Sequence, residues 1–127
     1  MIVYCAADLL WATRIRAAAD AAGVPARPVR SPDMLDARLA DSDVRTLIVD
    51  LEAGPVALEL VRRLRGPDAG ARLRAVHVVA FGPHVDRAGL DAARQAGADM
   101  VLPRGAFDAL LPRSVRAWAT GGGAESA

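Results

Sequence analysis

The sequence contains no lysine, no asparagine and a single cysteine, and these shortages limit what the chain can be. Cys5 has no partner for an internal disulfide, and its position in an apolar segment predicts a small buried side chain without a chemical role. No apolar run approaches the roughly 20 residues of a membrane span. The pattern therefore excludes a disulfide framework and predicts no membrane-spanning helix.

Neither sign of charge dominates. The 16 basic residues, all arginine, nearly balance the 15 acidic ones, and the net charge is +1. The overall field therefore attracts neither nucleic acid nor an anionic membrane, and we expect a protein partner instead. A local run of arginines is compatible with phosphate contacts, but a solvated helix edge also explains it; these are Arg62, Arg63, Arg65, Arg72 and Arg74.

The composition is that of one packed domain, with 53% hydrophobic and 24% charged residues among 127. We expect this domain to span residues 1–120 and the tail, residues 121–127, to be disordered. The apolar start at Met1 follows no basic leader, which predicts the absence of a secretory signal and a cytoplasmic location.

Segments rich in Val, Ile and Leu alternate with segments of helical spacing, the pattern of repeated strand–helix units around a parallel sheet. Asp8 is a good helix cap, and Ser31 followed by Pro32 marks a second helix start. The helices are expected from near Asp8, from Ser31, over residues 55–65, around Leu90, and from Phe107 to Trp118. The expected strands cover residues 2–6, 26–30, 46–51, 75–81 and 99–102.

Motifs for common cofactors are missing. The sequence has no glycine-rich dinucleotide or nucleotide loop and no hydrolase serine elbow. His77 and His84 have no zinc-site spacing, and residues 5–9 offer neither the hydroxyls nor the basic charge that a flavin phosphate needs. We therefore expect no enzymatic activity and no cofactor.

Two segments, Leu47 to Asp50 and Gln95 to Asp99, together with the five strand–helix units, resemble the receiver domains of bacterial two-component response regulators. The resemblance covers almost the whole chain. It implies a flavodoxin-like three-layer α/β sandwich whose five parallel strands lie in the order 2-1-3-4-5. It also implies a ligand site above the carboxyl ends of the strands.

In that family an aspartate on the third strand accepts phosphate beside a divalent metal, and Asp50 matches that position. Glu52 makes the neighbourhood acidic. The acidic pair that holds the metal falls on Ala6, Ala7 and Asp8, so at most one carboxylate remains. Asp8 is expected to cap a helix, but a weak Mg²⁺ site at Asp8 and Asp50 stays open.

Two other parts of the family's site are altered. The fourth strand ends in Ala80, Phe81 and Gly82, so the hydroxyl that reports phosphorylation has no counterpart. The lysine position holds Arg104, which either pairs with Asp50 or lies in a solvated loop. The predicted pocket around Asp50 comprises Asp8, Glu52, Phe81, His84 and Arg104, with His84 interpreted as an exposed loop residue or as a group that contacts a ligand.

The sequence thus predicts a degenerate receiver, a stand-alone signalling or scaffold module that binds proteins after losing phosphotransfer. The alternative is an active phosphoacceptor that uses Asp50 and Mg²⁺. Trp11 and Trp118 are each expected in the core. The resemblance nevertheless nominates Phe107, Leu111 and Trp118 as an interaction surface for a partner or a homodimer.

Overall fold

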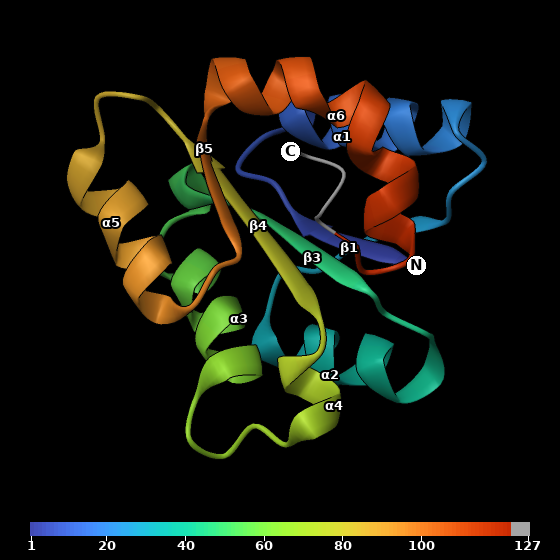
Figure 1. Ribbon diagram of the computed structural model, residues 1–127, viewed down its shortest axis with the longest axis vertical. Coiled ribbons are helices and arrows are strands. Elements are labelled where there is room, and N and C mark those ends of the chain that lie inside the picture. Colours follow the sequence, from blue (N-terminus) through green and yellow to red (C-terminus); the bar gives the residue numbers. More distant parts are fainter. Residues whose placement is uncertain (123–127) are drawn as a thin grey trace.

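A five-stranded parallel sheet forms the centre of the molecule in the computed structural model, which describes residues 1–122. The strands lie in the order β2-β1-β3-β4-β5, as predicted (Figure 1). β2 is a short edge strand that ends at Pro28, where a missing backbone donor is tolerated. The strands are β1 (Ile2–Cys5), β2 (Ala26–Pro28), β3 (Thr46–Asp50), β4 (His77–Gly82) and β5 (Met100–Pro103).

The helices begin where the sequence places capping side chains. The Trp11 N–H donates to Asp8 Oδ1 at 3.0 Å, and the Met34 N–H donates to Ser31 Oγ at 3.1 Å. The short α4 and the 3₁₀ turn η1 were not predicted. The helices are α1 (Leu9–Ala21), α2 (Pro32–Asp41), η1 (Leu51–Ala53), α3 (Pro55–Arg65), α4 (Ala71–Arg74), α5 (Arg87–Ala96) and α6 (Arg104–Ala119).

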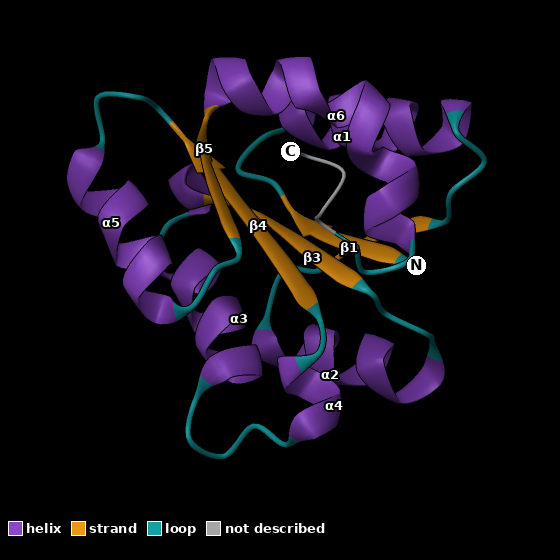
Figure 2. Ribbon diagram, in the orientation of Figure 1, coloured by secondary structure: helices purple, strands orange, loops and turns teal. Residues whose placement is uncertain are grey.

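The helices form two layers because alternate strand side chains point to opposite faces of the sheet. Ile2 and Tyr4 pack under α1 and α6, whereas Val3 and Cys5 pack with the helices on the other face. Figure 2 shows α1 and α6 together on one side of the strands and α2, α3 and α5 on the other. The predicted three-layer sandwich is confirmed. Within residues 1–122 no helix is both long enough and apolar enough to cross a membrane.

The segment that carried much of the resemblance, Gln95 to Asp99, joins α5 to β5. Gly97 ends α5 with a φ of +107°, a conformation that favours glycine, and an added Cβ would lie 2.8 Å from Arg65 Cγ. Arg65 Nη2 donates to Asp99 Oδ2 at 2.8 Å, and the Val78 N–H donates to the same oxygen at 2.8 Å. The segment therefore ties α3, β4 and β5 together.

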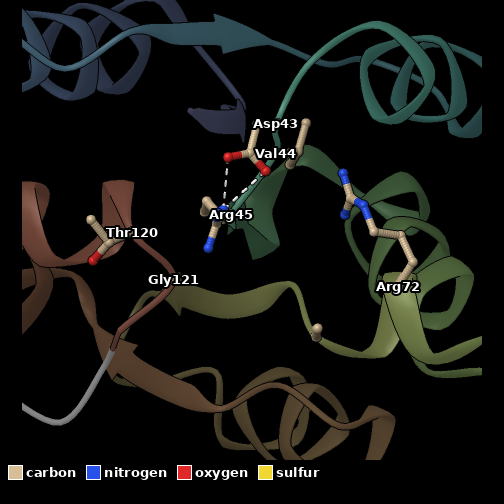
Figure 3. A pocket seen from close by; sticks show the side chains of 7 residues that line it. Asp43, Val44, Arg45, Arg72, Thr120 and Gly121 are labelled. Carbon is tan, nitrogen blue, oxygen red and sulfur yellow. Dashed lines mark hydrogen bonds and ion pairs between the residues drawn. The ribbon is translucent and has the colours of Figure 1, made fainter.

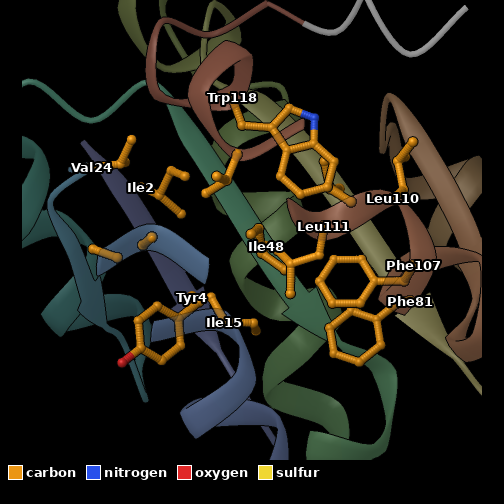
Figure 4. Packing of buried hydrophobic residues seen from close by; sticks show 14 of the residues in the cluster. Ile2, Tyr4, Ile15, Val24, Ile48, Phe81, Phe107, Leu110, Leu111 and Trp118 are labelled. Carbon is orange, nitrogen blue, oxygen red and sulfur yellow. The ribbon is translucent and has the colours of Figure 1, made fainter. Parts of the chain in front are cut away.

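Stacked aromatic side chains fill the core between the sheet and α6 (Figure 4). The Phe81 and Phe107 rings lie 4.0 Å apart between centroids, and Trp118 stacks on Phe107 at 6.1 Å. Trp11 lies 5.0 Å from Phe81 and is also buried. The expectation that both tryptophans lie in the core is confirmed.

The expected interaction surface is wrong, because its three residues lie in this core and not on the surface. Phe107, Leu111 and Trp118 are at most 2% exposed, because they form the stripe of α6 that faces the sheet. Phe81, assigned to the pocket, is likewise fully buried beneath α6. The helical spacing identified an apolar stripe but could not say whether the sheet or a partner covers it.

Two glycines, Gly121 and Gly122, end α6. Both belong to the segment that was expected to be a disordered tail. The Gly121 N–H donates to the Trp118 carbonyl, and the Gly122 N–H donates to the Ala117 carbonyl, both at 3.0 Å. Gly121 has a φ of +80°. The rest of that expected tail, residues 123–127, lies outside the described residues.

Replacing Phe107 by Ala should lower the free energy of unfolding by about 3–5 kcal/mol, because it leaves a cavity between two stacked rings. Urea unfolding measures this loss. Arg113→Ala, an exposed site on the same helix, should change stability by less than about 0.5 kcal/mol. A loss below about 1 kcal/mol for Phe107→Ala would place this ring outside the core.

Candidate functional site

The candidate site lies at the carboxyl end of β3, where Asp50 is completely buried. Its two oxygens accept hydrogen bonds from two different loops. The Ala7 N–H, just after β1, donates to Oδ2, and the Glu52 N–H donates to Oδ1, each at 3.0 Å. Asp50 also caps η1, which directs the chain from β3 toward α3. The carboxylate thus holds two loops together.

The surroundings of Asp50 act on its charge in opposite directions. Burial is the largest effect and raises the pKa of Asp50, since it disfavours the ionised form. The hydrogen bond from Ala7 and the positive charge of Arg104 lower the pKa, whereas the nearby Asp8 raises it. The net result is a pKa above the ordinary value of an aspartate.

The side chains around Asp50 do not fit a Mg²⁺ ion. Mg²⁺ requires nearly octahedral oxygen ligands that are free to face it. Both oxygens of Asp50 point to backbone donors, and Asp8 Oδ1 accepts the hydrogen bond that begins α1. Within residues 1–122, no three His, Cys, Asp or Glu side chains gather closely enough to hold a metal ion. The expectation that Asp8 caps a helix is confirmed.

Arg104 takes a partner that the sequence did not suggest. It was expected to pair with Asp50 or to lie in a solvated loop, but it opens α6 and its Nη2 forms an ion pair with Glu52 Oε1. The guanidinium carbon also lies 6.0 Å from the centre of the Trp11 ring. Both expectations for Arg104 are therefore wrong, because Glu52 extends toward it from the 3₁₀ turn.

The end of β4 offers no side chain that could replace the missing hydroxyl. Gly82 is the last residue of β4 and follows Phe81, the register partner of Asp50. A Cβ added to Gly82 would lie 3.3 Å from Leu51 Cβ, so the Leu51 side chain occupies the adjacent space. Leu51 is a part of the site that sequence reasoning missed; its position directly after Asp50 was the available signal.

His84 belongs to a different part of the surface. It is exposed and lines a hollow of about 310 Å³ on α5 together with Arg87, Leu90, Asp91 and Arg94. The described contacts of Asp50 and Arg104 include neither His84 nor the ring of Phe81. Of the predicted pocket, Glu52 contacts both Asp50 and Arg104, and Asp8 follows Ala7, whose N–H donates to Asp50.

A further hollow, of about 270 Å³, lies at the opposite end of the sheet, near the start of β3 (Figure 3). Arg45 Nε donates to both carboxylate oxygens of Asp43 at 2.9 Å, so the charges of this pair offset each other. The residues that line this hollow are Asp43, Val44, Arg45, Arg72, Ala75, Thr120 and Gly121. This hollow is separate from the Asp50 site.

Replacing Asp50 by Asn measures what burial of this charge costs. The pKa of Asp50 is higher in the folded state than in the unfolded chain, where it lies near 3.8. The contribution of Asp50 to the free energy of unfolding is therefore complete below pH 3.8, and it is lost as the pH rises through the raised pKa. Asn carries no charge. The free energy of unfolding of Asp50→Asn minus that of wild type should therefore increase with pH across this range. Urea unfolding at a series of pH values tests this, and a difference that falls with pH would contradict it.

Comparison with known families finds no family model that matches the chain, and no curated protein matches it either. Solved structures do match. The receiver domain of a histidine kinase from Syntrophus aciditrophicus has a TM-score of 0.75 at 19% identity, covering 94% of this chain and 89% of that one. A response-regulator receiver domain from Bermanella marisrubri has a TM-score of 0.73 at 18% identity, covering 92% and 95%.

A response regulator from Thermotoga maritima is similar over a comparable length. Its TM-score is 0.71 at 16% identity, and the match covers 94% of this chain and 96% of that one. Identities this low establish shape and not shared chemistry. With its five parallel strands in the order β2-β1-β3-β4-β5, the chain has the flavodoxin-like fold of response-regulator receiver domains.

Proposed function

We propose that the chain is a receiver-like signalling or scaffold module that binds a protein partner and has lost phosphotransfer. The observation that carries the proposal is the state of Asp50, which is fully buried and accepts a backbone hydrogen bond on each oxygen. In this role Asp50 stabilises two loops and is not a nucleophile. The receiver fold supports a signalling role by analogy.

Phosphorylation would require Asp50 to attack an incoming phosphoryl group. A carboxylate has about four acceptor positions, so two backbone donors do not exhaust it. However, no part of the residue is exposed to a phosphodonor, and its neighbours do not fit the Mg²⁺ that would offset the donor's charge. Arg104, the cation at this end of β5, is paired with Glu52. The attack therefore lacks both access and charge compensation.

The rest of the proposal follows from the charge balance and the sequence pattern. With a net charge of +1, the chain has no general attraction to nucleic acid or membranes, so the partner is a protein, and a second copy of the chain is one candidate. We also propose that the module is non-catalytic, needs no cofactor and works in the cytoplasm.

The alternative is an atypical receiver that is phosphorylated on Asp50 with Mg²⁺. The observation that favours it is the position of Asp50 at the carboxyl end of β3, in a fold shared with a response regulator from Burkholderia pseudomallei. That structure contains a phosphorylated aspartic acid and a calcium ion; its TM-score is 0.63 at 19% identity, covering 99% of this chain and 72% of that one.

Incubation with acetyl phosphate and Mg²⁺, followed by intact-protein mass spectrometry, separates the two. The proposal predicts no phosphoryl adduct on the wild type, under conditions in which an active receiver domain is labelled in parallel. Asp50→Asn is the matched control for adducts elsewhere, and it should leave binding to a protein partner unchanged. Stoichiometric labelling of the wild type that is lost in Asp50→Asn would overturn the proposal and support the alternative.

A further inference from the structure

We propose that a groove between α1 and α6 binds an acidic helix of a protein partner, whose carboxylates pair with Arg113 and Arg116. This inference deepens the proposed function, on which it rests for the existence of a protein partner, and it identifies where that partner binds and which charge it carries. The α1–α6 groove has a volume of about 400 Å³ and is lined by Ala18, Ala21, Ala22, Pro112, Arg113 and Arg116.

Pro112 accounts for the shape of the groove. It lies inside α6, where a proline has no N–H to donate to the carbonyl of Asp108 and its ring forces the helix to bend. Figure 1 shows the ribbon of α6 changing direction part-way along the helix. The residues of α1 that line the groove are alanines, whose short side chains leave space that neither helix fills. The groove therefore results from a bent helix opposite small side chains.

The two helices carry more arginines than their own acidic residues can neutralise. α1 and α6 contain five arginines and two aspartates between them. Three of these arginines form ion pairs within the chain: Arg14 with Asp108, Arg16 with Asp20, and Arg104 with Glu52. The two that remain, Arg113 and Arg116, are exposed, and within residues 1–122 neither has an ion-pair partner. They leave an uncompensated positive charge at the groove.

Other hollows on the described part of the surface differ from this groove in their charge. Three of them each contain an aspartate that pairs with an arginine of the same hollow, so their charges offset each other. These pairs are Asp43 with Arg45 near the start of β3, Asp91 with Arg94 on α5, and Asp20 with Arg16 on α1. Among the described residues that line the α1–α6 groove, none is acidic. This groove therefore lacks the negative charge that a partner would supply.

The spacing of the two arginines fits a helix that carries carboxylates on one face. Arg113 and Arg116 are three residues apart on α6, so they are neighbours on the helix surface. Acidic residues three or four positions apart on a partner helix have the same spacing, and a guanidinium can hold a carboxylate by two parallel hydrogen bonds. Apolar side chains of the partner would pack on Pro112 and the alanines of α1, in the recognition mode of a helix laid in a groove.

The test is the binding of a fluorescein-labelled, alanine-based helical peptide with two Glu residues three positions apart, measured by fluorescence anisotropy. A peptide with Gln at both positions is the matched control and should bind more weakly. Combining Arg113→Gln with Arg116→Gln should lower the affinity for the Glu peptide roughly fourfold to tenfold, the range expected for two exposed ion pairs. The same double variant should no longer distinguish the Glu peptide from the Gln peptide.

Two further variants separate the groove from general attraction to a basic surface. Combining Arg62→Gln with Arg72→Gln removes the same charge at two other exposed arginines and should leave binding unchanged. Ala21→Trp keeps every charge but fills the groove, so it should weaken binding. The proposal is overturned if the wild type does not bind the Glu peptide up to about 1 mM. An equal loss of affinity in the Arg62 and Arg72 variant, or unchanged binding in Ala21→Trp, would also contradict it.

Thermal unfolding verifies that each variant folds. If Ala21→Trp does not fold, the substitutions at the exposed Arg113 and Arg116 decide the question. A labelled DNA duplex that binds more tightly than the Glu peptide, and loses that binding in the same double variant, would overturn the assignment to a protein partner. The same proteins are also treated with acetyl phosphate. Phosphorylation of Asp50 in the wild type would overturn the proposed function, whereas peptide binding that does not depend on Arg113 and Arg116 would overturn the groove alone.

Discussion

The carboxylate of Asp50 joins the loop after β1 to the turn after β3 by accepting the N–H groups of Ala7 and Glu52. The other features of this edge depend on that junction. It directs η1 so that Leu51 packs beside Gly82 and Glu52 reaches Arg104. The cost is a buried charge, which raises the pKa of Asp50, and the two backbone donors offset part of that cost.

We propose that the aspartate at the carboxyl end of β3 stabilises the fold here and does not accept phosphate. In a carboxylate that accepts phosphate, oxygen atoms must be accessible and a metal must balance the charge. Here each oxygen of Asp50 accepts one backbone N–H, the residue is fully buried, and Asp8 caps a helix. We infer that the edge stabilises one shape of the domain, which a protein partner can recognise without phosphorylation.

Most of the fold could be predicted because local signals agreed with the global pattern. The buried run of β3, the Ser31–Pro32 helix start and the cap at Gly97 each mark an element boundary that the structure confirms. The α6 stripe was misassigned, since helical spacing does not identify what covers an apolar face. The Glu52–Arg104 pair was missed because its members lie two strands apart, and only side-chain direction brings them together.

The most direct test of the central claim follows the backbone amides of Ala7 and Glu52 by ¹⁵N NMR while Mg²⁺ and beryllofluoride, a phosphoryl mimic, are added. If both amides remain bonded to Asp50, their chemical shifts should not change as Mg²⁺ and the mimic are added up to millimolar concentrations. Saturable shifts of both amides, absent from Asp50→Asn, would show that the carboxylate releases its donors to bind the ion and the mimic, and would contradict the account.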